Sequence, residues 1–98
     1  MPVYFVAEIQ EIKDQASYLE YIESVEMIIQ RYGGKYLVRG GNSVTVSGGW
    51  KPIKIIVIRF DSIEKLQECF NSADYREIAP LREKATVGRA IAVEGIDT

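Results

Sequence analysis

The 98-residue sequence contains no histidine, only one cysteine and no long apolar run. Without histidine, the chain lacks the commonest general base near neutral pH, the usual zinc ligand and the usual proximal haem ligand. The single cysteine, Cys69, cannot form an internal disulfide. No apolar stretch approaches the roughly 18 residues of a membrane span, and the N-terminus lacks the basic region of a signal peptide. These absences predict a cytoplasmic protein with no metal, no cofactor and no membrane segment.

Charge and size narrow the class further. The formal net charge is -2, and the basic residues are spread along the chain with no basic stripe, so nucleic acid is not an expected partner. The composition is that of a globular protein, 47% hydrophobic and 27% charged. The length predicts a single domain over residues 1–98 with a modest core, which self-association would help to stabilise.

Hydrophobic periodicity predicts four strands and two helical regions. Alternation marks strands at residues 3–10, 35–39, 53–60 and 87–95. A stripe of apolar residues at helical spacing marks a first helix, which begins after Asp14 or Ser17 and ends near Arg31 or Tyr32. Ser17 and Glu20 also have the spacing of a capping box.

The second helical region is expected to be irregular. It follows Asp61 or Ser62, is interrupted at residues 71–72, and can start again with Ser72 as its cap. Pro80 should kink or split the second half. The order β-α-β-β-α-β is typical of the α+β ferredoxin-like fold, a four-stranded antiparallel sheet in the order 4-1-3-2 with both helices on one face.

Two glycine pairs flank the second strand in the segment YGGKYLVRGG, residues 32–41. Neither pair belongs to a phosphate-binding motif, so we favour hinges over a ligand cradle. Gly33 stands where a helix C-cap needs a left-handed residue. Gly40 and Gly41 are expected to form a bulge, after which the alternating segment SVTVS, residues 43–47, resumes the strand.

Alternation assigns side chains to the two faces of the sheet. One set carries no charge and should pack beneath the helices, with Ala90 and Ala92 allowing close helix approach: Val3, Phe5, Ala7, Ile9, Tyr36, Val38, Ile56, Ile58, Phe60, Ala90 and Ala92. The other set mixes aliphatic and charged residues: Tyr4, Val6, Glu8, Lys35, Leu37, Arg39, Ile55, Val57, Arg59, Arg89, Ile91 and Val93. Because no third layer exists to cover these aliphatic residues, we expect a homodimer that packs sheet face to sheet face.

Charged residues on the mixed face form the first candidate site. With the third strand taken as parallel to the first, Glu8 should lie between Arg59 and Arg89 at one end of the sheet. This arrangement is either a structural salt-bridge ladder or a carboxylate held between arginines that face an anionic ligand.

Several segments resemble the DUF1330 family: YFVAEI, YGGKYLVRGG, GGWKP, RFDS and NSADYREI followed by LR. The resemblance covers nearly the whole chain and implies a small dimeric α/β barrel of the ferredoxin-like class. The wider superfamily includes cofactor-free monooxygenases, isomerases and haem proteins. Positions that match the family pattern include Glu8, Tyr36, Arg39, Trp50, Ser72, Tyr75 and Arg82, whereas Pro80 is a departure from it.

Each candidate also has an ordinary structural explanation. Trp50 either walls a pocket or caps the core, and Arg82 either makes a surface ion pair or clamps a carboxylate. Tyr75 is expected in the core, Ser72 as a helix cap, and Cys69 as a buried, inert thiol.

Three functions stay open. The first is a cofactor-free enzyme acting on a small organic anion, with Glu8 or a tyrosine for proton transfer. The second is a module that binds or senses such an anion, and the third is a dimeric domain without a ligand. Tyr36, Arg39, Trp50, Arg59, Ser72, Tyr75 and Arg82 are the candidate ligand-binding residues.

Overall fold

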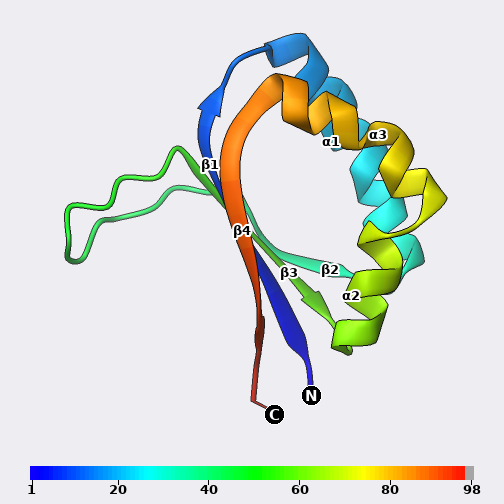
Figure 1. The fold of residues 1–98 in the computed structure, drawn as a ribbon. Helices are drawn as coiled ribbons and strands as arrows, with labels where there is room; N and C mark the ends of the chain where they lie inside the picture. The colour runs from blue at the N-terminus through cyan, green and yellow to red at the C-terminus, as the bar shows by residue number, and fades with distance from the viewer. Residues whose placement is uncertain (97–98) are drawn as a thin grey trace.

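A computed structural model describes residues 1–96 and confirms the ferredoxin-like fold. Figure 1 shows a twisted sheet with all of the helices on one side of it. The sheet order is β2-β3-β1-β4, and every neighbouring pair is antiparallel. The elements are β1 (Val3–Ile12), α1 (Gln15–Arg31), β2 (Lys35–Arg39), β3 (Lys54–Phe60), α2 (Ile63–Phe70), α3 (Ala73–Ala85) and β4 (Thr86–Glu94). No helix within residues 1–96 is long and apolar enough to cross a membrane.

Helix α1 begins and ends at residues whose local chemistry favours a cap. The Asp14 side chain accepts a hydrogen bond from the Ser17 amide, so Asp14 is the N-cap and the predicted capping box at Ser17 is wrong. At the other end, the Gly33 amide donates to the Gln30 carbonyl and the Gly34 amide to the Ile29 carbonyl. This is a Schellman motif, and Gly33 has the predicted positive φ, 81°.

The direction of β3 corrects the predicted charge ladder. β3 runs antiparallel to β1, because the β2–β3 connection reverses the chain, so Glu8 pairs with Ile55 and Arg59 pairs with Tyr4. Arg59 therefore lies at the opposite end of the sheet from Glu8, and it forms an ion pair with Asp61. Only the Glu8–Arg89 half of the predicted ladder exists, with the two residues directly opposite on β1 and β4.

A bulge in β2 changes which residues face the helices. The register with β3 shifts between Tyr36 and Val38, so the bulge lies at Leu37 and not at the glycines. Because of this shift, Val38 pairs with Val57 on the outer face and Arg39 pairs with Ile56 on the inner face. The predicted faces of Val38 and Arg39 were therefore both wrong. Gly40, with a φ of 74°, ends the strand.

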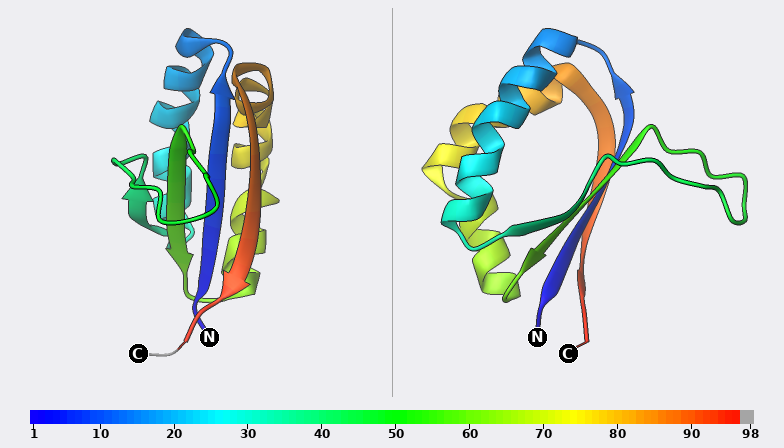
Figure 2. Two further views of the ribbon diagram at one scale, coloured as in Figure 1. Left: turned by 90° about the vertical axis from the view of Figure 1, so that its left-hand side faces the viewer. Right: turned by 180° about the vertical axis from the view of Figure 1, so that it is seen from behind.

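Residues 40–53 form an extended arm between β2 and β3. In Figures 1 and 2 the arm projects from the sheet on the side away from the helices. It has no regular secondary structure, so the predicted continuation of the strand through residues 43–47 is wrong. The alternating sequence favours a strand, but the arm has no partner strand within residues 1–96.

The core consists of two clusters at opposite ends of the space between sheet and helices. The larger one is built around Val3, Ile29 and Phe60, and the smaller one contains Ile9, Tyr18 and Ala85. Helix α3 closes the layer and continues through Pro80, so it is not split at the proline. The break lies at residues 71–72, as predicted, where the Ser72 hydroxyl accepts a hydrogen bond from the Tyr75 amide.

Candidate functional site

A cavity of about 530 Å³ separates the sheet from the helices between the two core clusters. This volume is typical of small-molecule sites. Its walls are mostly aromatic and aliphatic, with several charged residues among them. The lining includes Phe5, Ala7, Glu8, Ile9, Tyr18, Tyr21, Ile22, Glu26, Tyr36, Arg39, Lys54, Ile56, Phe70, Tyr75, Arg82, Glu83, Gly88, Arg89 and Ala90.

Small residues on the inner face of the sheet make room for the cavity. Gly88 pairs with Ile9, and Ala90 pairs with Ala7, so β1 and β4 present little side-chain volume there. Ala90 and Ala92 were predicted to let a helix approach closely, but both are exposed. The cavity is continued along β4 by a shallower groove that Ala90 and Ala92 also line. The missing side-chain volume thus leaves a binding space open beside an edge strand.

Tyrosine hydroxyls supply most of the uncharged polar groups of the cavity. The hydroxyls of Tyr21 on α1 and Tyr75 on α3 lie 2.9 Å apart and form a hydrogen bond. Burial raises the pKa of Tyr21 strongly and that of Tyr36 to about 12. Both side chains are therefore neutral phenols at physiological pH, able to donate hydrogen bonds but unsuited to act as bases.

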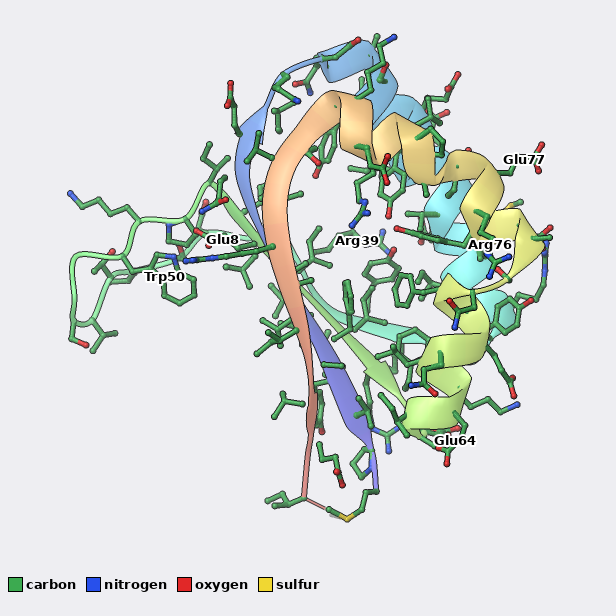
Figure 3. All side chains as sticks on the ribbon, viewed as in Figure 1. Glu8, Arg39, Trp50, Glu64, Arg76 and Glu77 are labelled. Carbon is green, nitrogen blue, oxygen red and sulfur yellow. The ribbon has the colours of Figure 1, made fainter. Side chains whose placement is uncertain are left out.

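Cations from three different elements lie around this aromatic space. Arg39 donates a hydrogen bond of 2.8 Å to the Glu26 carboxylate, and its guanidinium lies 4.4 Å from the centre of the Tyr36 ring. The Lys54 ammonium lies 5.0 Å from the centre of the Tyr18 ring. Arg82 lines both the cavity and the groove, and it has no ion-pair partner within residues 1–96. Figure 3 shows Arg39 in the space between the sheet and the helices.

Glu8 also lines the cavity, and it joins the sheet to the base of the arm. Its carboxylate accepts hydrogen bonds from the indole Nε1 of Trp50 at 2.9 Å and from Nε of Arg89 at 2.8 Å, and Figure 3 shows Glu8 and Trp50 side by side. Only 10% of the Glu8 side chain is exposed. The Trp50 hydrogen bond, with a smaller contribution from Arg89, holds the pKa of Glu8 below its ordinary value of 4.5. A carboxylate kept ionised in this way is a poor proton acceptor.

The predicted site residues therefore fall into different places. The cavity brings together Glu8, Tyr36, Arg39, Tyr75 and Arg82. Trp50 and Arg59 are not part of its lining, and Ser72 caps α3. Burial raises the pKa of the Cys69 thiol to about 11, consistent with the inert thiol expected from the sequence.

Sequence reasoning missed three residues of the cavity. Tyr21, Glu26 and Lys54 all line it. Tyr21 could have been found, because it lies about one helical turn after Tyr18, which belongs to the apolar stripe of the first helix. No comparable spacing in the sequence pointed to Glu26 or Lys54. Within residues 1–96 no group of three or more acidic or cysteine side chains could hold a metal ion.

The sequence matches a known protein family over almost its whole length. Residues 2–96 match the family described as "Domain of unknown function (DUF1330)". The chain belongs to the DUF1330 family. No protein of curated function matches it.

Solved structures with the same fold are distant in sequence. A protein of unknown function from Rhodopseudomonas palustris has a TM-score of 0.80 and 16% identity, over 99% of this chain and 84% of that one. SnoaB, a cofactor-independent oxygenase from Streptomyces nogalater, has a TM-score of 0.73 and 8% identity, over 99% and 95%. A dimeric protein of unknown function from Bacteroides fragilis has a TM-score of 0.55 and 8% identity, over 96% of each chain. At such identities the likeness shows the fold alone.

Proposed function

We propose that this DUF1330 protein binds a small organic anion in the cavity between sheet and helices. The observation that carries the proposal is Arg82, which lines an aromatic-lined cavity and has no ion-pair partner within residues 1–96. A guanidinium pairs with a carboxylate through two parallel hydrogen bonds. The phenols of Tyr21 and Tyr36 add donors, and the aromatic walls suit an apolar body.

Binding is better supported than catalysis. The carboxylate predicted for proton transfer, Glu8, is held by hydrogen bonds from Trp50 and Arg89, and its pKa is lowered. The raised pKa values of Tyr21 and Tyr36 keep these groups protonated. Of the two ligand functions left open by the sequence, a binding or sensing module is therefore the one we favour over a cofactor-free enzyme.

The test compares a charged ligand with its neutral isostere. 4-Hydroxybenzoate and 4-hydroxybenzamide have the same ring and hydroxyl, but only the former carries a carboxylate. Isothermal titration calorimetry should give tighter binding of 4-hydroxybenzoate. Arg82→Gln should weaken it roughly tenfold to a hundredfold, because a hydrogen bond to a charged group contributes about 1.5–3 kcal/mol.

Arg76 offers a matched control on the same helix. It is exposed and does not line the cavity, so Arg76→Gln removes the same charge without touching the site. Equal affinities of the wild type, Arg82→Gln and Arg76→Gln for 4-hydroxybenzoate would contradict an anion site at Arg82. Equal affinity of the wild type for acid and amide would contradict the preference for an anion.

We also propose a homodimer formed through the outer face of the sheet. Leu37, Val38, Ile91 and Val93 are all exposed there in the single chain, and exposed apolar patches of this kind mark protein interfaces. The Bacteroides fragilis protein of the same fold is described as dimeric. A two-fold axis between two such faces would cover both at once.

A further inference from the structure

Residues 43–47 of the arm have the sequence of a strand but form no backbone hydrogen bonds within residues 1–96. Residues 43–47 alternate polar and β-branched side chains, and Val44 and Val46 are 87% and 94% exposed. Fourteen residues without regular structure are unusual in a domain of this size. Exposed β-branched residues on such a segment indicate a contact that a single chain does not make.

The base of the arm is held in place. The Trp50 indole is hydrogen-bonded to Glu8 on β1, and the Thr45 hydroxyl donates a hydrogen bond of 2.6 Å to the Trp50 carbonyl, which joins the two halves of the arm. Figure 3 shows Trp50 pointing back towards the sheet while the rest of the arm extends beyond it. An arm that is fixed at its base loses less conformational entropy when its outer part binds.

The opposite edge of the same sheet carries the complementary feature. β4 pairs only with β1, so one side of its nine-residue backbone is free within residues 1–96. Ile91 and Val93 of β4 are exposed on the outer face. Free edges of this length favour pairing with another strand, and proteins usually cover them.

We propose that the arm crosses to a second copy of the chain, where residues 43–47 pair with the free edge of β4 and Val44 and Val46 pack against Ile91 and Val93. The arm leaves the sheet between β2 and β3, with β1 between β3 and β4. Donor segment and acceptor edge are thus both present on one chain, but on different sides of the sheet. This makes a second copy the fitting partner, because a two-fold axis forms the contact twice. The inference rests on the proposed homodimer and assigns it a specific contact.

Sedimentation velocity over a range of concentrations tests the contact. Val46→Asp places a charge where the arm should meet β4, whereas Ser47→Asp adds the same charge at the neighbouring polar position. Both side chains are exposed in the single chain, so neither change should disturb its fold. We expect Val46→Asp to raise the dimer Kd at least tenfold and Ser47→Asp to change it less than threefold. Equal Kd values for the two variants would overturn the arm contact while leaving the dimer. A wild-type chain that stays monomeric would overturn both proposals.

Cysteine pairing locates the contact on β4. Val46→Cys and Ile91→Cys are prepared separately, mixed and oxidised, and the products are separated on a non-reducing gel. The buried Cys69 should contribute little. The mixture should give a disulfide-linked dimer, and each variant alone much less. Cross-linking that is no stronger in the mixture than in the separate variants would overturn the pairing with β4.

Discussion

The indole Nε1 of Trp50 donates a hydrogen bond of 2.9 Å to the carboxylate of Glu8, which joins the arm to β1 across 42 positions of sequence. Trp50 is the only tryptophan in the chain. Glu8 also accepts a hydrogen bond from Arg89, so one carboxylate connects the arm, β1 and β4. Because these hydrogen bonds stabilise the charged form, the contact is intact at neutral pH and weakens only in acid.

Trp50→Phe should raise the pKa of Glu8 towards 4.5, because the indole hydrogen bond is the main cause of its lowering. Phenylalanine keeps most of the ring and removes only the donor. The pKa of Glu8 in the wild type is depressed, so its contribution to stability is present above pH 4.5 and is lost as the pH falls through the lowered value. The carboxyl carbon of Glu8, followed by NMR titration, measures the change. An unchanged pKa of Glu8 in Trp50→Phe would contradict the role of the indole hydrogen bond.

Alanine substitutions at three glycines distinguish the cost of backbone strain from the cost of steric crowding. Gly33 has a φ of 81° and open space around it, so Gly33→Ala should cost about 1–2 kcal/mol through left-handed strain alone. A Cβ at Gly34 would lie 2.5 Å from Cγ2 of Ile29, and Gly34→Ala should cost about 1–3 kcal/mol through overpacking of the core.

Gly41 is the control for both changes, because it has neither a positive φ nor a neighbour within 4 Å of an added Cβ. Gly41→Ala should change the free energy of unfolding by less than about 0.5 kcal/mol. Urea unfolding at one fixed protein concentration provides the measurement, since the proposed dimer would make stability depend on concentration. An unchanged stability of Gly33→Ala would contradict the hinge interpretation.

The sequence was sufficient to predict the fold but not the composition of the site. Alternation and helical periodicity are local signals, and they identified the strands, the first helix and the interruption before Ser72. Arg39 was placed on the wrong face because the bulge at Leu37 shifts the register by one residue. Tyr36, Leu37 and Val38 are all strand formers, so nothing in their sequence indicates which of them is the extra residue.

Long-range contacts could not be predicted in the same way. Residues 43–47 have a strand pattern, but no strand within residues 1–96 pairs with them. The hydrogen bond from Trp50 to Glu8 depends on the path of the arm and has no local signal. The cavity depends on where small residues of β1 and β4 lie opposite each other, which only the register decides.

Pro80 should be a destabilising residue in α3. It lies inside a continuous helix, it is exposed, and it has no N–H to donate to the Arg76 carbonyl. Proline in a helix interior costs about 3 kcal/mol of stability. Proline also restricts the unfolded chain, and this restriction offsets up to about 1 kcal/mol of the cost. Pro80→Ala should therefore raise the free energy of unfolding by about 2 kcal/mol in urea. Glu77→Ala, at an exposed position of the same helix (Figure 3), should change it by less than about 0.5 kcal/mol. A loss of stability in Pro80→Ala would show that the proline fits this helix without strain.

The hydroxyl pair of Tyr21 and Tyr75 should couple the two helices that wall the cavity. Each phenol is the other's hydrogen-bond partner at 2.9 Å, and both rings lie in or beside the larger core cluster. Tyr21→Phe and Tyr75→Phe should each lower the free energy of unfolding by about 1 kcal/mol, because each leaves one hydroxyl without its partner. The double variant should cost less than the sum of the two single changes, with a coupling of about 0.5–1.5 kcal/mol in a double-mutant cycle. The same variants also test binding. Loss of a hydroxyl donor in the cavity should weaken the binding of 4-hydroxybenzoate. Tyr32→Phe should not weaken it, because Tyr32 lies outside the cavity lining. Strict additivity of the two single changes would show that the hydroxyls do not interact in solution.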